Sequence, residues 1–158
     1  MCDYSLAALR SRLAAQSEEL VIYRFPTGSL GLTTPAELEM YKPQFHGWWS
    51  SFDASQVPCA ICIPHGAGLL LRDIPERLQQ RLGIGAEEEV TFVQLSADEG
   101  RHRDGIRFRN GQEILLQRLA EGQRARVVSL ASAEVAEEES DEVVQAWLRP
   151  PENAELPA

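Results

Sequence analysis

The second residue of the chain has a side chain and a position that could support catalysis. Cys2 directly follows Met1, and removal of Met1 would place a thiol and an α-amine on one residue. An α-amine has an ordinary pKa of about 7.7–8.0, so it can act as the base for its own thiol. Cys2 is therefore the candidate catalytic residue. The alternative, which the shortness of the motif favours, is a cysteine that only begins the chain or packs inward.

Cys59, Cys62 and His65 form a second group, with a spacing that is typical of zinc ligands. Residues 59–63 also predict a strand, on which the two cysteine side chains would face opposite sides of the sheet. No second CxxC or HxxxH motif completes a set of four ligands. The sequence favours two buried structural cysteines at this place.

A third arrangement combines the two groups. Cys2 with His65, His46 or His102 could form a cysteine–histidine dyad or hold a soft transition metal. Cys2 and His65 are the candidate metal ligands, and no other cofactor is predicted.

The Met-Cys start resembles that of three protein classes. These are the N-terminal nucleophile amidotransferases, the proteins that trap abasic DNA through an N-terminal cysteine, and the small β-barrel chaperones of hydrogenase maturation. The first two usually have Gly or Arg after the cysteine, where this chain has Asp3. The resemblance implies an alternative function, either an amidohydrolase-like enzyme or a metal-binding maturation chaperone that uses Cys2 with a histidine.

Two pairs of arginines are candidate binding residues. Arg107 and Arg109 alternate with apolar residues on one predicted strand, and Arg124 and Arg126 do so on another. In neighbouring strands the pairs would form one basic patch for phosphate or RNA, or a patch covered by the acidic tail. The interpretation that we favour is a solvated sheet face balanced by nearby carboxylates, because charged faces are usual for soluble sheets and no aromatic residues interleave with the arginines on that face.

Trp48 and Trp49 are candidate contact residues for a partner. On an extended segment, adjacent side chains point to opposite sides, so one tryptophan would anchor in the core and the other would face a partner. Anchoring of both in the core is the alternative.

The elements that position these residues predict one β-rich domain over residues 1–130. The 158-residue length suits a single domain. Residues 131–158 hold eight acidic residues and one basic residue, a balance of −7, which leaves −2 of the net charge of −9 for residues 1–130. The rest is predicted to be an acidic linker, a short helix and a frayed tail. The start lacks signal-peptide features, and the odd number of cysteines does not suggest a disulfide framework. We therefore expect a cytoplasmic location.

The fold predicted for residues 1–130 is a small antiparallel barrel or sandwich with one short internal helix at 75–83. About six or seven strands are expected, over residues 20–25, 30–33, 60–63, 90–95, 106–109, 113–119 and 124–130, and residues 69–71 form a further apolar run. The second half is predicted to be a β-meander with a two-residue Asn110-Gly111 turn. Asp73 is the expected N-cap of the helix, and Gly83 is expected to end it.

The opening Met-Cys-Asp-Tyr-Ser-Leu resembles the start of a group of uncharacterised bacterial proteins. Similar elements recur later, in residues 19–25, 61–66 and 119–123. This resemblance implies an organisation and no function. The leading hypothesis is a non-catalytic binding module with a protein partner, because no phosphate loop, triad or complete metal set is present. Nucleic acid is disfavoured, no membrane partner is expected, and exposed strand edges would permit a homodimer.

Overall fold

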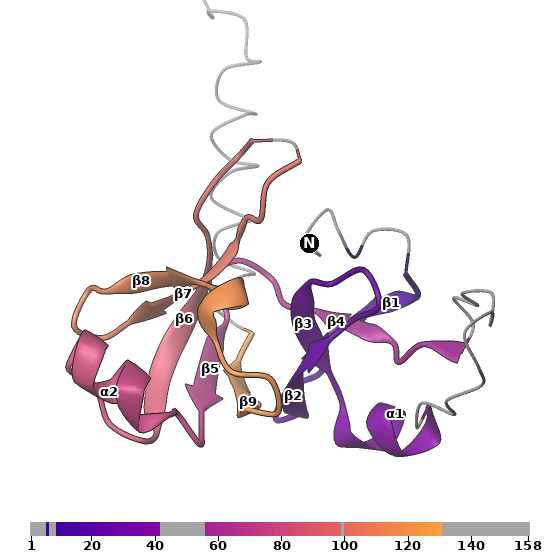
Figure 1. Cartoon of the computed structure of the whole chain (residues 1–158), viewed down its shortest axis with the longest axis horizontal. Helices are drawn as coiled ribbons and strands as arrows, with labels where there is room; N and C mark the ends of the chain where they lie inside the picture. Colours follow the sequence, from indigo (N-terminus) through magenta and orange to yellow (C-terminus); the bar gives the residue numbers. More distant parts are fainter. Residues whose placement is uncertain (1–5, 7–8, 42–55, 99, 131–158) are drawn as a thin grey trace, which may run out of the picture.

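A computed structural model describes residue 6 and residues 9–41, 56–98 and 100–130 of the chain. Its centre is a seven-stranded antiparallel sheet that curls into a half-barrel (Figure 1). In spatial order the strands are β3 (Leu30–Thr33), β2 (Glu19–Arg24), β9 (Arg124–Ser129), β5 (Gly68–Leu71), β6 (Glu88–Gln94), β7 (Asp104–Phe108) and β8 (Glu113–Leu115).

Five shorter elements accompany the sheet. Strands β1 (Ser11–Leu13) and β4 (Ala60–Cys62) pair in parallel, and β4 lies close to β3. The helices are α1 (Pro35–Met40) and α2 (Glu76–Leu82), and a short 3-10 helix, η3 (Leu116–Arg118), follows β8. None of the helices within the described ranges is long and apolar enough to cross a bilayer.

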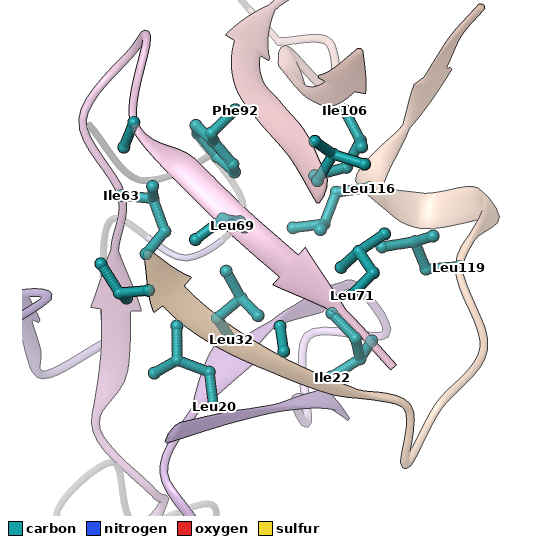
Figure 2. Close-up of a cluster of buried hydrophobic side chains, with 14 of the residues drawn as sticks. Leu20, Ile22, Leu32, Ile63, Leu69, Leu71, Phe92, Ile106, Leu116 and Leu119 are labelled. Carbon is teal, nitrogen blue, oxygen red and sulfur yellow. The ribbon is translucent and has the colours of Figure 1, made fainter. Parts of the chain in front are cut away.

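The inward-facing residues of the sheet strands form the larger of two hydrophobic clusters among the described residues. Figure 2 shows aliphatic and aromatic side chains from the strands gathered in one cluster, which includes Leu116, the first residue of η3, and Leu119, the residue after it. Leu20, Leu69 and Ile106 are almost completely buried in this cluster. Full burial of one such side chain stabilises the fold by about 1.5–3 kcal/mol. The period-two pattern of the sequence is therefore the main cause of the sheet.

The open edge of the half-barrel is closed by a side chain. The N–H group of Leu30, on edge strand β3, donates to Oε1 of Gln117 (2.8 Å), and Nε2 of Gln117 donates to the carbonyl of Leu30 (2.7 Å). A backbone peptide in a β-ladder would make the same pair of bonds. Gln117 thus links the segment after the last strand, β8, to the first strand of the sheet, β3.

The structure confirms a mainly β fold with strands at the predicted places and an internal helix at the predicted position. Gly83 has φ +65° and ends α2 as expected. The tail after residue 130, including its predicted helix, lies outside the described residues, as does the irregular segment 42–55.

Three local predictions are wrong. Asp73 does not cap α2, because the N-cap residue is Pro75 and the Asp73 carboxylate pairs with Arg124 instead. The turn after β7 has three residues, since Phe108 N–H bonds to the Gln112 carbonyl and Gly111 takes φ +86°. The returning strand ends at Leu115, where the chain turns into η3 so that Leu116 and Leu119 reach the core.

The predicted β-meander is also wrong in its last step. Strand β9 does not lie beside β8 but pairs with β2 and β5 in the middle of the sheet. The segment between β8 and β9 is anchored by Leu119 in the core, so the chain crosses the end of the half-barrel before β9 begins. The buried Ala125 and Val127 of β9 have core neighbours on both sides there.

Candidate functional site

The two predicted arginine pairs do not form one patch. Arg107 and Arg109 lie on or just after β7, whereas Arg124 and Arg126 lie on β9. Strands β5 and β6 separate β9 from β7, so the prediction of neighbouring strands fails together with the meander.

Each of these four arginines is paired with a carboxylate. Nε of Arg107 lies 2.7 Å from Oε1 of Glu113, and Arg109 pairs with Glu89. The other two pairs are Arg124 with Asp73 (Nε to Oδ2, 2.6 Å) and Arg126 with Glu19 (Nε to Oε1, 3.5 Å). The outer sheet face is therefore the balanced, solvated surface that the sequence favoured.

A shallow hollow of about 360 Å³ lies on this face between β9 and β7. Its floor contains Gly68, and its rim includes Arg107, Arg109, Glu89 and the exposed Val128, the residue at a break in the β5–β9 register. Both arginines at the rim are already neutralised, so an incoming anion would have to displace a carboxylate of the protein itself.

The described cysteines do not form a metal site with histidine. Cys59 is buried with a free thiol, and burial raises the pKa of that thiol. Cys62 is buried as predicted, but it is disulfide-bonded, contrary to the prediction from the odd number of cysteines, so its sulfur is not a free ligand. Nδ1 of the exposed His65 accepts a hydrogen bond from the Gln94 N–H group (3.1 Å). No cluster of three potential ligands occurs in the described part of the chain.

Several predicted residues fall outside the described ranges. Cys2, His46, Trp48 and Trp49 are among them, so the nucleophile, the Cys2–His65 metal pair and the tryptophan contact remain predictions. His102 is described and half-buried at the end of the loop between β6 and β7.

A different set of arginines is distinguished by its lack of partners. Nine described arginines form ion pairs with carboxylates: Arg10, Arg12, Arg24, Arg72, Arg101, Arg107, Arg109, Arg124 and Arg126. Within the described ranges, Arg77, Arg81, Arg103 and Arg118 form none. Three of these four, Arg77, Arg81 and Arg118, line a single groove, which we call the arginine groove.

This arginine groove lies between α2 and the segment that contains η3 and has a volume of about 390 Å³. Its lining consists of Pro75, Arg77, Leu78, Arg81, Gln117, Arg118, Leu119 and Ala120. All three guanidinium groups belong to exposed residues, whereas Leu78 and Leu119 are buried and form part of its apolar base.

Both walls of the groove are fixed by hydrogen bonds to the body of the protein. Nδ2 of Asn110 donates to the Leu82 carbonyl at the end of α2 (2.8 Å), and Nε2 of Gln79 donates to the Ile74 carbonyl (2.7 Å). The opposite wall is held by the bonds of Gln117 to Leu30. The groove is therefore formed before any ligand binds.

The charges of the groove are not balanced locally. Arg77 and Arg81 are four residues apart on α2, which places them as neighbours on one helix face, and like charges at this spacing destabilise a helix by about 0.2–0.5 kcal/mol. Of the carboxylates nearest in sequence, Glu121 pairs with Arg24, and Glu76 accepts a hydrogen bond from Gln80 and forms no ion pair with a described arginine. An anion in the groove would relieve this repulsion.

The chain matches no protein-family model, no curated protein and no solved structure. The functional argument therefore rests on the geometry of the groove.

The groove was not predicted from the sequence, although the pairing of two of its arginines on one helix face could have been recognised. Arg77 and Arg81 have helical i, i+4 spacing within the segment that predicts a helix. The contribution of Arg118 depends on the turn of the chain into η3, which the sequence had suggested as a continued strand. The lack of carboxylate partners is a property of the folded surface alone.

Proposed function

We propose that this protein is a non-catalytic binding module that recognises an acidic segment of a protein partner in the arginine groove. The single observation that carries the proposal is that Arg77, Arg81 and Arg118 surround an apolar base without any described carboxylate partner. Guanidinium groups bind carboxylates through paired hydrogen bonds, and a preformed groove reduces the entropy that binding must offset.

The lining favours a peptide over a nucleic acid. Single-stranded nucleic acids are held by aromatic side chains on which the bases stack, and none of the described residues that line the groove is aromatic. The apolar contribution comes from Pro75, Leu78 and Leu119, which suit an aliphatic or aromatic side chain placed between acidic residues. An acidic peptide with an apolar anchor offers both kinds of contact.

Fluorescence anisotropy tests this proposal with a labelled peptide Glu-Glu-Glu-Trp-Glu-Glu-Glu and the matched peptide that has Gln in place of Glu. We expect salt-sensitive binding of the acidic peptide only. The triple variant R77Q/R81Q/R118Q is expected to bind at least about tenfold more weakly, because each exposed charge pair contributes up to about 1 kcal/mol.

The matched control is R107Q/R109Q/R126Q, which removes the same charge from the outer sheet face. Its affinity should stay within about twofold of that of the unmodified protein. Equal losses in the two triple variants would show a general charge effect and overturn the proposal. Binding of a single-stranded RNA oligonucleotide in preference to the acidic peptide would overturn it as well.

A further inference from the structure

We infer that the acidic C-terminal segment of this same chain, residues 134–147, is the resident occupant of the arginine groove and excludes other acidic segments from it. This inference rests on the proposed function, because it takes the groove to be a site for acidic peptides. It adds a competitor that is covalently part of the protein.

The charge of the segment complements that of the groove. Residues 134–142 contain six acidic side chains and no basic one: Glu134, Glu137, Glu138, Glu139, Asp141 and Glu142. The groove presents three arginines that form no ion pair within the described ranges. Other arginines near the sheet are less suitable targets, because Arg107, Arg109, Arg124 and Arg126 already have carboxylate partners.

The apolar residues of the segment complement the base of the groove. Val143, Val144 and Trp147 follow directly after the acidic run. The buried Leu78 and Leu119 at the base, together with Pro75, offer apolar surface to such side chains. Acidic residues beside an apolar anchor are the chemistry that the groove selects.

The chain is long enough to reach the groove. Strand β9 begins at Arg124, which is bonded to Asp73 just before α2, and it ends at Ser129. A six-residue strand is about 20 Å long, so residue 130 lies on the order of 20 Å from that end of the sheet. Residues 131–142 can span up to about 40 Å when extended, which is more than this distance.

Covalent attachment strengthens such a competitor. A segment tethered by a short linker acts at an effective concentration in the millimolar range. Weak contacts between carboxylates and arginines are then sufficient to keep the groove occupied, and a partner must supply either higher affinity or a higher local concentration. The expected consequence is autoinhibition of peptide binding.

The test uses the full-length chain with the tail charges removed, E134Q/E137Q/E138Q/E139Q/D141N/E142Q. The probe is again the labelled peptide Glu-Glu-Glu-Trp-Glu-Glu-Glu. We expect the tail variant to bind the probe at least tenfold more tightly than the unmodified chain does. The control E152Q/E155Q neutralises tail residues outside the segment and should change the affinity less than twofold.

A second measurement distinguishes occupancy from general repulsion. In two-dimensional NMR spectra, the side-chain N–H signals of Arg77, Arg81 and Arg118 should shift when the tail is neutralised. The corresponding signal of Arg101, which pairs with Asp98, should not shift.

The outcomes separate this inference from the proposed function. Equal probe affinity in the unmodified chain and the tail variant, with binding still lost in R77Q/R81Q/R118Q, would overturn the inference and leave the proposed function standing. Absence of probe binding to both would overturn both. A gain that disappears when the protein is diluted would assign the occupant to the tail of a second copy and overturn the intramolecular claim.

Discussion

Arg77, Arg81 and Arg118 differ from the paired arginines in what an incoming anion must displace. An anion at Arg107 competes with the Glu113 carboxylate at 2.7 Å, and one at Arg124 competes with Asp73. At the groove, no described carboxylate has to leave. Arginines with a carboxylate partner therefore balance the surface charge, whereas the three arginines of the groove are available to bind an anion.

The sulfur atoms give a prediction at the scale of single residues. Cys59 is buried, and the pKa of its thiol is raised, so iodoacetamide at neutral pH should leave it unlabelled in the folded protein and label it after denaturation. Cys62 is disulfide-bonded and should become labelled only after denaturation and addition of a reductant. Peptide mapping by mass spectrometry measures both sites.

The same labelling bears on the expected cytoplasmic location, because disulfides persist in oxidising compartments and are rare in the cytoplasm. Rapid labelling of Cys62 without reductant, in denatured protein taken directly from its natural cell, would favour the cytoplasm and contradict the disulfide. Rapid labelling of Cys59 in the folded protein would contradict its assignment as an inert core residue.

At the scale of elements, the closure of the half-barrel depends on the amide of Gln117. Gln117→Met keeps the size of the side chain but removes both bonds to Leu30, whose backbone is buried. We expect the free energy of unfolding to fall by about 1–3 kcal/mol, which is the usual penalty for buried polar groups left unpaired. Urea denaturation followed by circular dichroism measures this change.

Gln117→Glu separates the donor role from the acceptor role. An ionised carboxylate can accept from the Leu30 N–H group but repels the Leu30 carbonyl, whereas a protonated carboxyl group can make both bonds. The stability deficit of this variant should therefore narrow as the pH falls toward about 4. The control is Gln112→Met at an exposed turn position, and an equal loss there would show that the Leu30 contacts are unimportant.

The elements also show how far the sequence could predict this fold. Strands β2, β6, β7 and β9 were predictable from local signals, namely β-branched and aromatic content or the alternation of polar and apolar residues along a strand. The position of β9 between β2 and β5 was not predictable, since it depends on contacts distant in the sequence. The predicted basic patch depended on that position and failed with it. The arginine groove was missed for the same reason, because it joins α2 to a segment about forty residues later.

At the scale of the whole molecule, charge is divided between two parts of the chain. Residues 1–130 have a balance of −2, and residues 131–158 have a balance of −7. Most described arginines on the sheet are paired, so the net positive surface is concentrated at the groove. The arginine groove and the acidic C-terminal segment carry opposite charges that are not balanced locally. Electrostatic attraction between them would therefore favour contact within the same chain.

Acid should destabilise the whole molecule through two carboxylates in different regions. The Arg124 side chain lowers the pKa of Asp73, and the Arg12 side chain lowers the pKa of Glu18. A carboxyl group whose pKa is lower in the folded state stabilises the fold above its unfolded pKa of about 4, and that contribution is lost as the pH falls through the folded value. The midpoint of urea denaturation should therefore be constant near neutral pH and fall below about pH 4.

In Asp73→Asn the midpoint should be lower at neutral pH, and the fall below pH 4 should be smaller. The control is Asp98→Asn, which should keep the full acid dependence. Asp98 lies 3.9 Å from Arg101 in an exposed ion pair, and such pairs contribute little to stability because water screens them. An unchanged acid slope in Asp73→Asn would show that the Asp73–Arg124 pair does not link the start of β9 to the residues before α2 in solution.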